Sequence, residues 1–148
     1  MQRLLPPQVF FLLAFTMAPV CYWLDGPHWL PYPANLAGVP ILIAGLAIAI
    51  WHKRLFVRQQ TNIPTFGEPD KLIQAGLFRY SRNPMYLGML TGLSGAAILC
   101  FAAPAAWLLV GVFFVMLHFW YIPFEEAQMQ HKFKHQYEAY CQQTRRWL

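Results

Sequence analysis

The chain has 148 residues, of which 57% are hydrophobic and only 11% are charged. Soluble domains carry about 25% charged residues, so this composition excludes a disordered chain and argues against an ordinary soluble domain. A chain this short cannot bury several wholly apolar helices on every face, which disfavours a soluble helical bundle. The composition predicts a small all-α, polytopic membrane protein that forms one domain over residues 1–148.

Long stretches without charge predict the membrane spans. A spanning helix needs about 20 apolar residues, and residues 84–124 contain no Lys, Arg, Asp or Glu over a length that suits two. Pro104 predicts a turn within this stretch, because proline disfavours helix at the preceding residue. We therefore expect four transmembrane helices, at about 4–24, 36–51, 85–101 and 105–124. A signal peptide is the alternative for the first, but its apolar stretch is too long and no clear cleavage site follows.

The basic residues predict the topology. The expected connections at 25–35 and around Pro104 have no Lys or Arg, and all 11 Lys and Arg lie in the N-terminus, in 53–83 or after residue 124. The positive-inside rule then places both termini and the loop 53–83 in the cytoplasm. Topology and anionic headgroups account for the basic excess, so we expect membrane lipids as partners and no nucleic acid.

The 3 cysteines do not predict a metal site, because the sequence has no Cys-x-x-Cys motif. We interpret Cys21, Cys100 and Cys141 as thiols that take part in packing. A disulfide between Cys21 and Cys100 is the alternative, since both lie near the outer ends of their expected helices.

The expected cytoplasmic segments contain apolar as well as charged residues. Loop 53–83 is long for so small a protein, and such loops are usually functional or disordered. Its apolar residues and turn signals predict that it packs against the helix ends. The tail is expected to form an amphipathic helix over 125–144, whose stripe we interpret as packing rather than cofactor contact. The stripe consists of Met129, Phe133, Tyr137, Tyr140 and Thr144.

The stretch 76–88 is the densest in candidate functional residues. Asn83 is a favoured N-cap and Pro84 a favoured first helical residue, so a helix is expected to start here. The free N–H groups of that helix end suit an anionic group, and Gly88 allows a ligand or another helix to come close. The alternative is that the Asn83-Pro84 pair only starts a span and that Tyr86 belongs to the interfacial aromatic belt.

Glu125 and Glu126 form an acidic pair at the edge of the last expected span. Carboxylates at a membrane edge are costly unless they are paired, and they are by default a functional hypothesis. The alternative is a solvated helix start after Pro123. His118 lies deeper in the same helix and either takes part in packing or lines a pocket.

One combined pattern links these features. It reads Gly76-x-Phe78-x-Tyr80-x-Arg82-Asn83-Pro84-x-Tyr86-x-Gly88, then a helical hairpin, then Glu125-Glu126, then Phe133-x(3)-Tyr137-x(2)-Tyr140. The pattern resembles the isoprenylcysteine carboxyl methyltransferase family, whose wider group includes phospholipid N-methyltransferases. The resemblance covers residues 61–148. It implies a membrane-embedded, S-adenosylmethionine-dependent methyltransferase whose cofactor lies at the cytoplasmic ends of the last two spans.

The resemblance and the chemistry of the residues together define an expected site. The cofactor-binding candidates are Lys71, Leu72, Ile73, Phe78, Tyr80, Asn83, Pro84, Met85, Tyr86, Glu125 and Glu126. The catalytic candidates are Arg82, Tyr86 and Glu125. Many family members have His at the position of Asn83, and the eukaryotic enzymes have a substrate-binding Arg at the position of Tyr121. Tyr121 and His118 are accordingly the candidate substrate-binding residues.

Three functions compete for this pattern. They are carboxyl O-methylation of an isoprenylcysteine-type substrate, N-methylation of a phospholipid or another hydrophobic amine, and a non-catalytic membrane scaffold. A carboxylate is already a nucleophile, whereas a protonated amine must first lose a proton to a base. The pocket-forming stretches contain no histidine, so the sequence favours a lipophilic carboxylate, such as a prenylated cysteine, as the methyl acceptor.

Overall fold

The computed structural model describes residues 4–24, 27–58 and 71–148, and every named element within them is helical. The elements are α1 (Pro6–Leu24), η1 (Ala34–Ala37), α2 (Gly38–Arg58), η2 (Gly76–Arg79), α3 (Pro84–Leu99), α4 (Pro104–Met116), η3 (Leu117–Tyr121), α5 (Ile122–Phe133) and α6 (His135–Gln143). Because η3 is a π-helical turn, α4, η3 and α5 form one continuous helix. The expected all-α class is confirmed.

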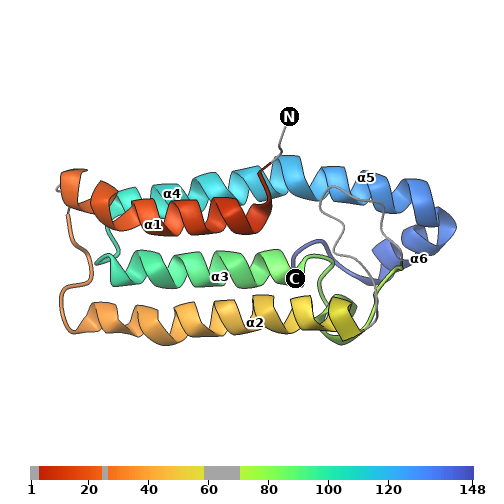
Figure 1. Cartoon of the computed structure of the whole chain (residues 1–148), viewed down its shortest axis with the longest axis horizontal. Coiled ribbons are helices and arrows are strands. Elements are labelled where there is room, and N and C mark those ends of the chain that lie inside the picture. The colour runs from red at the N-terminus through yellow and green to blue at the C-terminus, as the bar shows by residue number, and fades with distance from the viewer. Residues whose placement is uncertain (1–3, 25–26, 59–70) are drawn as a thin grey trace.

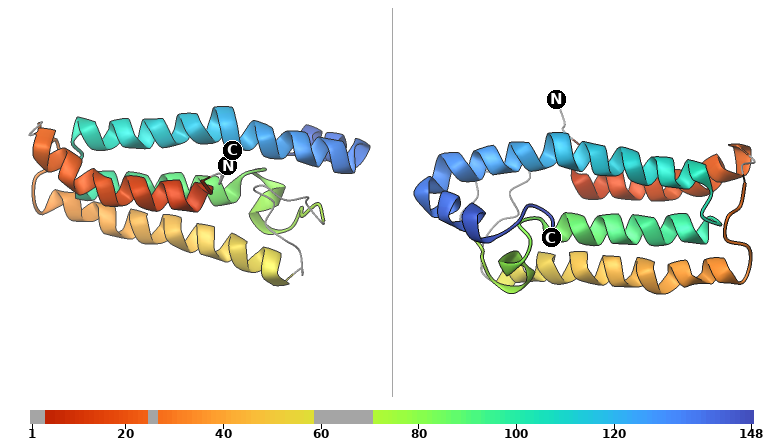
Figure 2. Two further views of the ribbon diagram at one scale, coloured as in Figure 1. Left: turned by 45° about the horizontal axis from the view of Figure 1, so that its top comes forward. Right: turned by 180° about the vertical axis from the view of Figure 1, so that it is seen from behind.

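The helices lie along one common direction. Helix α1 runs beside α4, and α2 runs beside α3, with the most extensive helix–helix interface between α2 and α3 (Figures 1 and 2). Helix α5 continues the line of α4 beyond the ends of α1, α2 and α3. Helix α6 then folds back from the end of α5. The C-terminus consequently lies near the start of α3, which Figure 2 shows from behind.

Three helical segments are long and apolar enough to cross a membrane. They are Pro6–Leu24, Ala34–Leu55 and Pro104–Phe133. Helix α3 is also apolar but has only 16 residues. Membrane-spanning helices are therefore supported, while the number of four spans and the placement of both termini in the cytoplasm stay predictions.

The expected turn of the helical hairpin is present. Helix α3 ends at Leu99 and α4 begins at Pro104. Phe101 and Ala102 adopt positive φ angles of 59° and 52°, and the Ala102 amide donates to the Ala97 carbonyl at 3.0 Å. This bond closes the end of α3 in the manner of a helix C-cap.

Helix α2 is longer at its C-terminal end than the expected span 36–51, because it continues to Arg58. The sequence from residue 46 to residue 58 has no Gly or Pro to end the helix. Arg58 in the last turn also suits the negative end of the helix dipole. The first residues of the expected loop 53–83 are thus helical, and residues 59–70 of that loop lie outside the described part of the chain.

The expected tail helix 125–144 is wrong as a single element. Residues 125–133 belong to α5, which continues the last apolar helix, and Lys134 separates α5 from α6. Lys134 has φ 45°, a conformation that ends a helix and that only glycine adopts without cost. The sequence has no glycine or proline at this point to indicate the break.

Glycines bring α2 and α3 into backbone contact. A Cβ atom added to Gly45 would lie 2.2 Å from the Gly92 nitrogen, and one added to Gly88 would lie 2.8 Å from the Gly45 carbonyl oxygen. Small residues allow this close approach of apolar helices. Gly88 therefore serves helix packing, and the contact fixes the position of the start of α3, where the candidate site lies.

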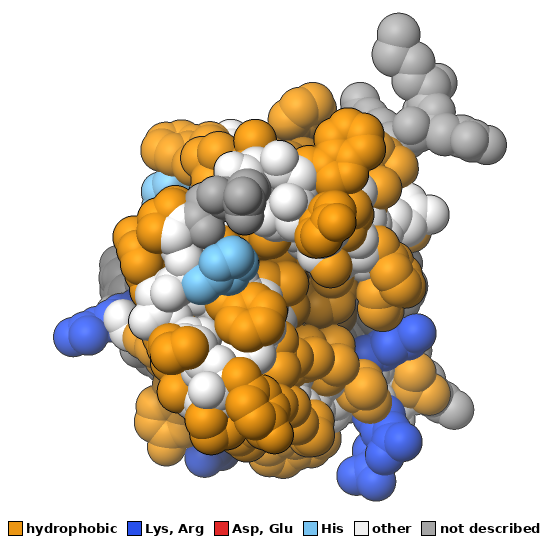
Figure 3. All heavy atoms as spheres, turned by 90° about the vertical axis from the view of Figure 1, so that its left-hand side faces the viewer, with side chains coloured by type: hydrophobic (Ala, Val, Ile, Leu, Met, Phe, Trp, Pro, Cys, Tyr) orange, Lys and Arg blue, Asp and Glu red, His pale blue; other side chains and the backbone are white. Residues whose placement is uncertain are grey.

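The end of the molecule where α1 ends and α2 begins is mostly apolar. Figure 3 shows this end covered by hydrophobic side chains, with Lys and Arg only at its rim. Cys21 is buried here and Cys100 is half-buried. All three cysteines are free thiols in the structure.

Candidate active site

Three distant parts of the sequence meet at the start of α3. They are the turn before α3, the start of α5, and α6 with the residues that follow it. They enclose a cavity of about 60 Å³. Its walls are formed by Lys71, Leu72, Ile73, Phe78, Arg82, Asn83, Glu125, Glu126, Met129, Tyr137 and Tyr140.

A short hydrogen bond connects α3 to α5 beside this cavity. The Tyr86 hydroxyl donates to Glu125 Oε1 at 2.5 Å. Tyr86 is buried in the first turn of α3, and Glu125 is half-buried. Of the side chains that the structure describes, Tyr86 alone hydrogen-bonds Glu125, so the carboxylate keeps acceptor capacity for a ligand.

Glu126 has different partners from its neighbour. Arg82 Nη2 donates to Glu126 Oε1 at 3.0 Å, and Arg146 donates to both carboxylate oxygens, from Nε at 3.2 Å and from Nη2 at 2.5 Å. A two-pronged guanidinium–carboxylate pair is among the strongest polar contacts in proteins. Two cations therefore compensate the charge of Glu126, and this residue joins α3, α5 and the C-terminal residues.

Arg82 is largely engaged in holding the C-terminal residues. Its Nη1 donates to the carbonyls of Thr144 at 3.0 Å and Cys141 at 3.3 Å, and its backbone amide donates to the Arg145 carbonyl at 2.9 Å. Its Nε is buried and has no hydrogen-bond partner among the described residues. A buried guanidinium N–H without an acceptor is costly, which makes it a candidate donor to a bound anionic group.

Asn83 does not act as the side-chain N-cap that its position suggests. It precedes α3, and Pro84 is the first helical residue as expected, but the Asn83 side chain makes no capping bond. Its amide nitrogen instead donates to the Arg146 carbonyl at 2.9 Å. The expected helix start with Asn83 at the N-cap position is therefore confirmed, while its side chain binds the C-terminal residues, which are distant in sequence.

The apolar wall of the cavity is built around Phe78. Phe78 and Ile73 are buried together and pack with Met85. The Tyr140 hydroxyl donates to the Phe78 carbonyl at 2.7 Å, and the ring of His52 meets the Phe78 ring edge-on at 5.6 Å. These contacts connect α2, η2 and α6 to the same wall.

The two tyrosines of α6 stay protonated. Burial raises the pKa of Tyr140 to about 12, and it raises the pKa of Tyr137 further. Both hydroxyls are therefore neutral hydrogen-bond donors at physiological pH, and neither serves as a phenolate base.

Most of the expected cofactor residues gather at this cavity. Lys71, Leu72, Ile73, Phe78, Asn83, Glu125 and Glu126 line it, as does the expected catalytic Arg82. Tyr86 does not line the cavity itself but hydrogen-bonds Glu125, which does. Pro84 is fully buried, and Met85 packs against Phe78. Tyr80 does not take part, because its side chain is 69% exposed.

The two expected substrate-binding residues have other partners. The Tyr121 hydroxyl donates to the carbonyl of Leu4, which ties η3 to the segment before α1. His118 accepts a hydrogen bond from the Trp147 indole. Neither residue lines the cavity around Glu125.

Sequence reasoning missed part of the cavity wall. Met129, Tyr137 and Tyr140 line it, although the stripe that contains them was interpreted as packing. Their regular spacing was the available signal. No local pattern indicated that residues 145–147 return to the start of α3, because that contact joins distant parts of the chain.

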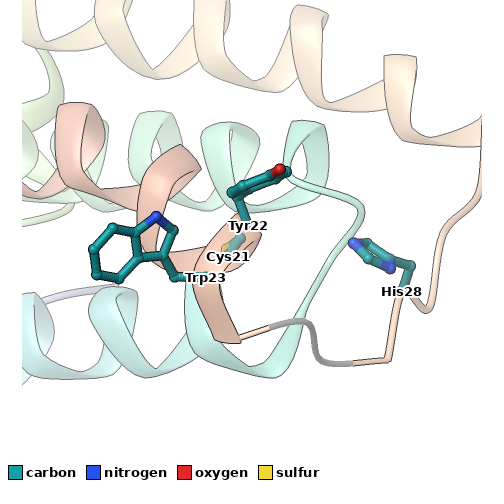
Figure 4. Close-up of a pocket in the computed structure, with 4 residues that line it drawn as sticks. All are labelled: Cys21, Tyr22, Trp23 and His28. Atoms are coloured by element: carbon teal, nitrogen blue, oxygen red, sulfur yellow. The ribbon is translucent and has the colours of Figure 1, made fainter.

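A second cavity lies at the opposite end of the molecule. It has a volume of about 460 Å³ and is lined by Cys21, Tyr22, Trp23 and His28. Figure 4 shows His28 on the segment after α1, across from Tyr22 and Trp23 at the end of that helix. Among the residues that the structure describes, no carboxylate, guanidinium or motif residue lines this cavity.

The sequence model of the phospholipid methyltransferase family matches residues 34–136, which is more than half of the chain. The chain belongs to this family. As a family member with long apolar helices, it is an integral membrane methyltransferase that acts on a lipid-type acceptor. The expected family resemblance is confirmed, and the family implies S-adenosylmethionine as methyl donor. Comparison with curated proteins and with solved structures found no match.

The charged groups at the cavity suit S-adenosylmethionine. Glu125 offers a carboxylate to an ammonium or to hydroxyl groups, and Arg82 Nε offers a donor to a carboxylate. The cavity of about 60 Å³ is much smaller than the pockets of about 300 Å³ or more that hold such ligands. A ligand of that size would fit here only if the walls of this cavity moved apart.

Proposed function

We propose that the cavity at Glu125 binds S-adenosylmethionine and that the protein transfers the methyl group to a lipophilic acceptor, on the cytoplasmic side of the membrane. The observation that carries this proposal is the convergence of Tyr86, Glu125 and the partnerless Arg82 Nε at one small cavity. In this assignment Glu125 binds the ammonium or the ribose hydroxyls. Arg82 Nε binds the methionyl carboxylate.

The residues would accelerate the reaction mainly by alignment. The donor supplies a methyl group on a sulfonium, and the acceptor displaces the neutral thioether in line. Fixing two reactants in such a geometry is worth up to about 7–11 kcal/mol in ideal cases. The apolar wall formed by Ile73, Phe78 and Met85 would keep water away, and the Phe78 ring can face the sulfonium by a cation–π contact.

The first candidate acceptor is the carboxylate of an isoprenylcysteine-type substrate. A carboxylate needs no general base. No histidine is among the described residues that line the cavity, and both tyrosines of α6 stay protonated. The product of this reaction is a methyl ester.

The second candidate is N-methylation of a phospholipid amine. The match to the phospholipid methyltransferase family favours it. It needs a base, and His118, which precedes Glu125 by 7 residues on the same continuous helix, is the candidate. One of its two ring nitrogens, Nδ1, is already occupied by a hydrogen bond from the Trp147 indole.

The test uses purified protein in lipid nanodiscs, with S-adenosylmethionine labelled on its methyl group. The acceptors are a farnesylated cysteine and phosphatidylethanolamine, and the Glu125→Gln variant is the control. Volatile label released by base indicates a methyl ester, whereas base-stable label in the lipid extract indicates an N-methyl product. Failure of the wild-type protein to bind S-adenosylmethionine would overturn the proposal and favour a non-catalytic scaffold.

A further inference from the structure

The last residues of the chain form a strap across the site. This C-terminal strap, residues 144–148, leaves α6 and runs past the start of α3 to η3. Arg145 pairs with Ser81 in a parallel β-bridge, and the Arg146 carbonyl accepts from the Asn83 amide at 2.9 Å. The strap is thus held at two points before it reaches His118.

Trp147 and His118 form the third contact of the strap. The Trp147 indole Nε1 donates to His118 Nδ1 at 3.1 Å, and the two rings are nearly parallel, at 13°. Phe114 packs on both, with ring centroids 5.5 Å from His118 and 5.4 Å from Trp147. The imidazole is therefore held in one orientation by a hydrogen bond and by aromatic packing.

The direction of this hydrogen bond determines where His118 carries its proton. An indole N–H can only donate, so His118 Nδ1 must be the acceptor and must be unprotonated. A neutral imidazole then carries its hydrogen on Nε2. Within the described part of the chain, Nε2 has no hydrogen-bond partner. The structure thus holds an N–H donor for which the described residues provide no acceptor.

The position of His118 suits contact with the methyl acceptor. It lies in the π-helical turn η3, and such turns occur frequently at functional sites. It precedes Glu125 on one continuous helix, at about 1.5 Å rise per residue, so it lies about 10 Å deeper towards the apolar part of the helix. A lipophilic acceptor that approaches Glu125 from the membrane would pass this depth.

We propose that Trp147 fixes His118 as a hydrogen-bond donor, and that His118 Nε2–H binds an anionic oxygen of the acceptor's head group. This inference rests on the proposed methyl transfer and specifies its acceptor: an amphiphile with a negatively charged oxygen beside its apolar chain. A phosphodiester and a carboxylate share this chemistry. In this role His118 is a specificity-determining donor and is not the general base.

The tautomer can be measured without any methyl transfer. The protein is labelled with ¹⁵N-histidine in nanodiscs, and the His118 signals, among those of 5 histidines, are identified by their loss in His118→Gln. We expect the Nε2–H tautomer in the wild-type protein. Trp147→Phe keeps an aromatic ring but removes the indole N–H, so the signals should shift to a mixture of tautomers. A wild-type Nδ1–H tautomer would overturn the proposal even if the protein is an active methyltransferase.

Kinetics separate binding from base catalysis. Trp147→Phe should raise KM for an anionic acceptor about twofold for a roughly equal mixture of tautomers, because only the Nε2–H fraction binds it, and should leave kcat within about twofold. His118→Leu removes the donor altogether and should raise this KM about tenfold, the loss expected for one hydrogen bond to a charged group. The acceptors are farnesylated cysteine, phosphatidylethanolamine, and a lipid amine without phosphate, for which KM should not change. The acceptor whose KM rises identifies the source of the anionic oxygen.

His118→Gln keeps an N–H donor and should retain more acceptor affinity than His118→Leu. A loss of kcat with unchanged KM in Trp147→Phe would overturn the proposal in favour of a base. If no acceptor is methylated, the proposed function fails, and the tautomer measurement still decides whether Trp147 fixes His118.

Discussion

Two adjacent glutamates at the start of α5 have opposite surroundings. Glu126 is bound by the guanidiniums of Arg82 and Arg146, whereas Glu125 receives one tyrosine hydroxyl. Successive helical residues point about 100° apart, so the two carboxylates necessarily meet different elements. A poorly compensated carboxylate at a cavity is costly in the absence of a ligand and is therefore the better candidate to bind a cationic one.

Glu125→Ala should lower the affinity for S-adenosylmethionine at least about tenfold, because a hydrogen bond to a charged group contributes about 1.5–3 kcal/mol. Calorimetric titration of the purified protein measures this. Glu126→Ala is the matched control and should lower cofactor affinity less, since its partners are arginines of the protein. Equal and small effects of the two substitutions would mean that neither carboxylate contacts the cofactor.

Tyr86→Phe should destabilise the protein, because it leaves the half-buried Glu125 carboxylate without its tyrosine donor. Such a loss costs about 1–3 kcal/mol. Thermal unfolding in detergent measures the change, and Tyr80→Phe is the control because Tyr80 is exposed. Unfolding midpoints that are the same for both variants would show that the hydroxyl of Tyr86 is dispensable and that only its ring matters.

At the scale of elements, the sequence predicts the helix boundaries and apolar helices that neighbouring residues determine. Pro84 and Pro104 indicate the starts of α3 and α4, and the uncharged stretches indicate the apolar helices. The break at Lys134 could not be predicted, because lysine has no preference for positive φ. The side-chain partner of Asn83 was missed because Arg146 is distant in the sequence.

The contact between α2 and α3 depends on glycines that can be tested one by one. Gly45→Ala should cost about 1–3 kcal/mol or more, because its Cβ would lie 2.2 Å from the Gly92 nitrogen. Gly92→Ala should be tolerated, since its Cβ would lie at ordinary contact distances, 3.6 Å from the Phe10 ring and 3.7 Å from the Leu42 carbonyl oxygen. Gly111→Ala is a second control, with nothing within 4 Å. Thermal unfolding measures the stability of the three variants. A Gly45→Ala variant as stable as Gly92→Ala and Gly111→Ala would contradict the close packing of α2 on α3.

At the scale of the whole molecule, composition and charge predicted a membrane protein, and the motifs predicted its family. The motifs also predicted most of the residues that meet at the cavity. The C-terminal strap was not predicted, because its contacts with Asn83, Glu126 and His118 join residues far apart in the sequence. Periodicity and local motifs carry no information about such contacts.

The distribution of basic residues predicts the orientation in the membrane. In a cysteine-free background, a cysteine at Trp29, which is exposed in the segment between α1 and α2, should react with a membrane-impermeant maleimide added outside intact cells. A cysteine at His135, which is exposed at the start of α6, should react only after the cells are opened. Labelling of the His135 position in intact cells would contradict the cytoplasmic placement of the C-terminus.

Helix α3 is short compared with the bilayer. Its 16 residues span about 24 Å, whereas the hydrocarbon layer is about 30 Å thick. The Asn35 amide donates to the Leu99 carbonyl at 3.2 Å, so α2 and α3 are level at the end that carries the hairpin turn. The difference between the length of α3 and the thickness of the hydrocarbon layer therefore lies at the other end of α3, where Asn83 and Glu125 are. For an α3 that crosses the membrane, we expect this hydrophobic mismatch to place the cavity below the headgroup plane, where an acceptor lipid could present its polar group sideways without leaving the bilayer.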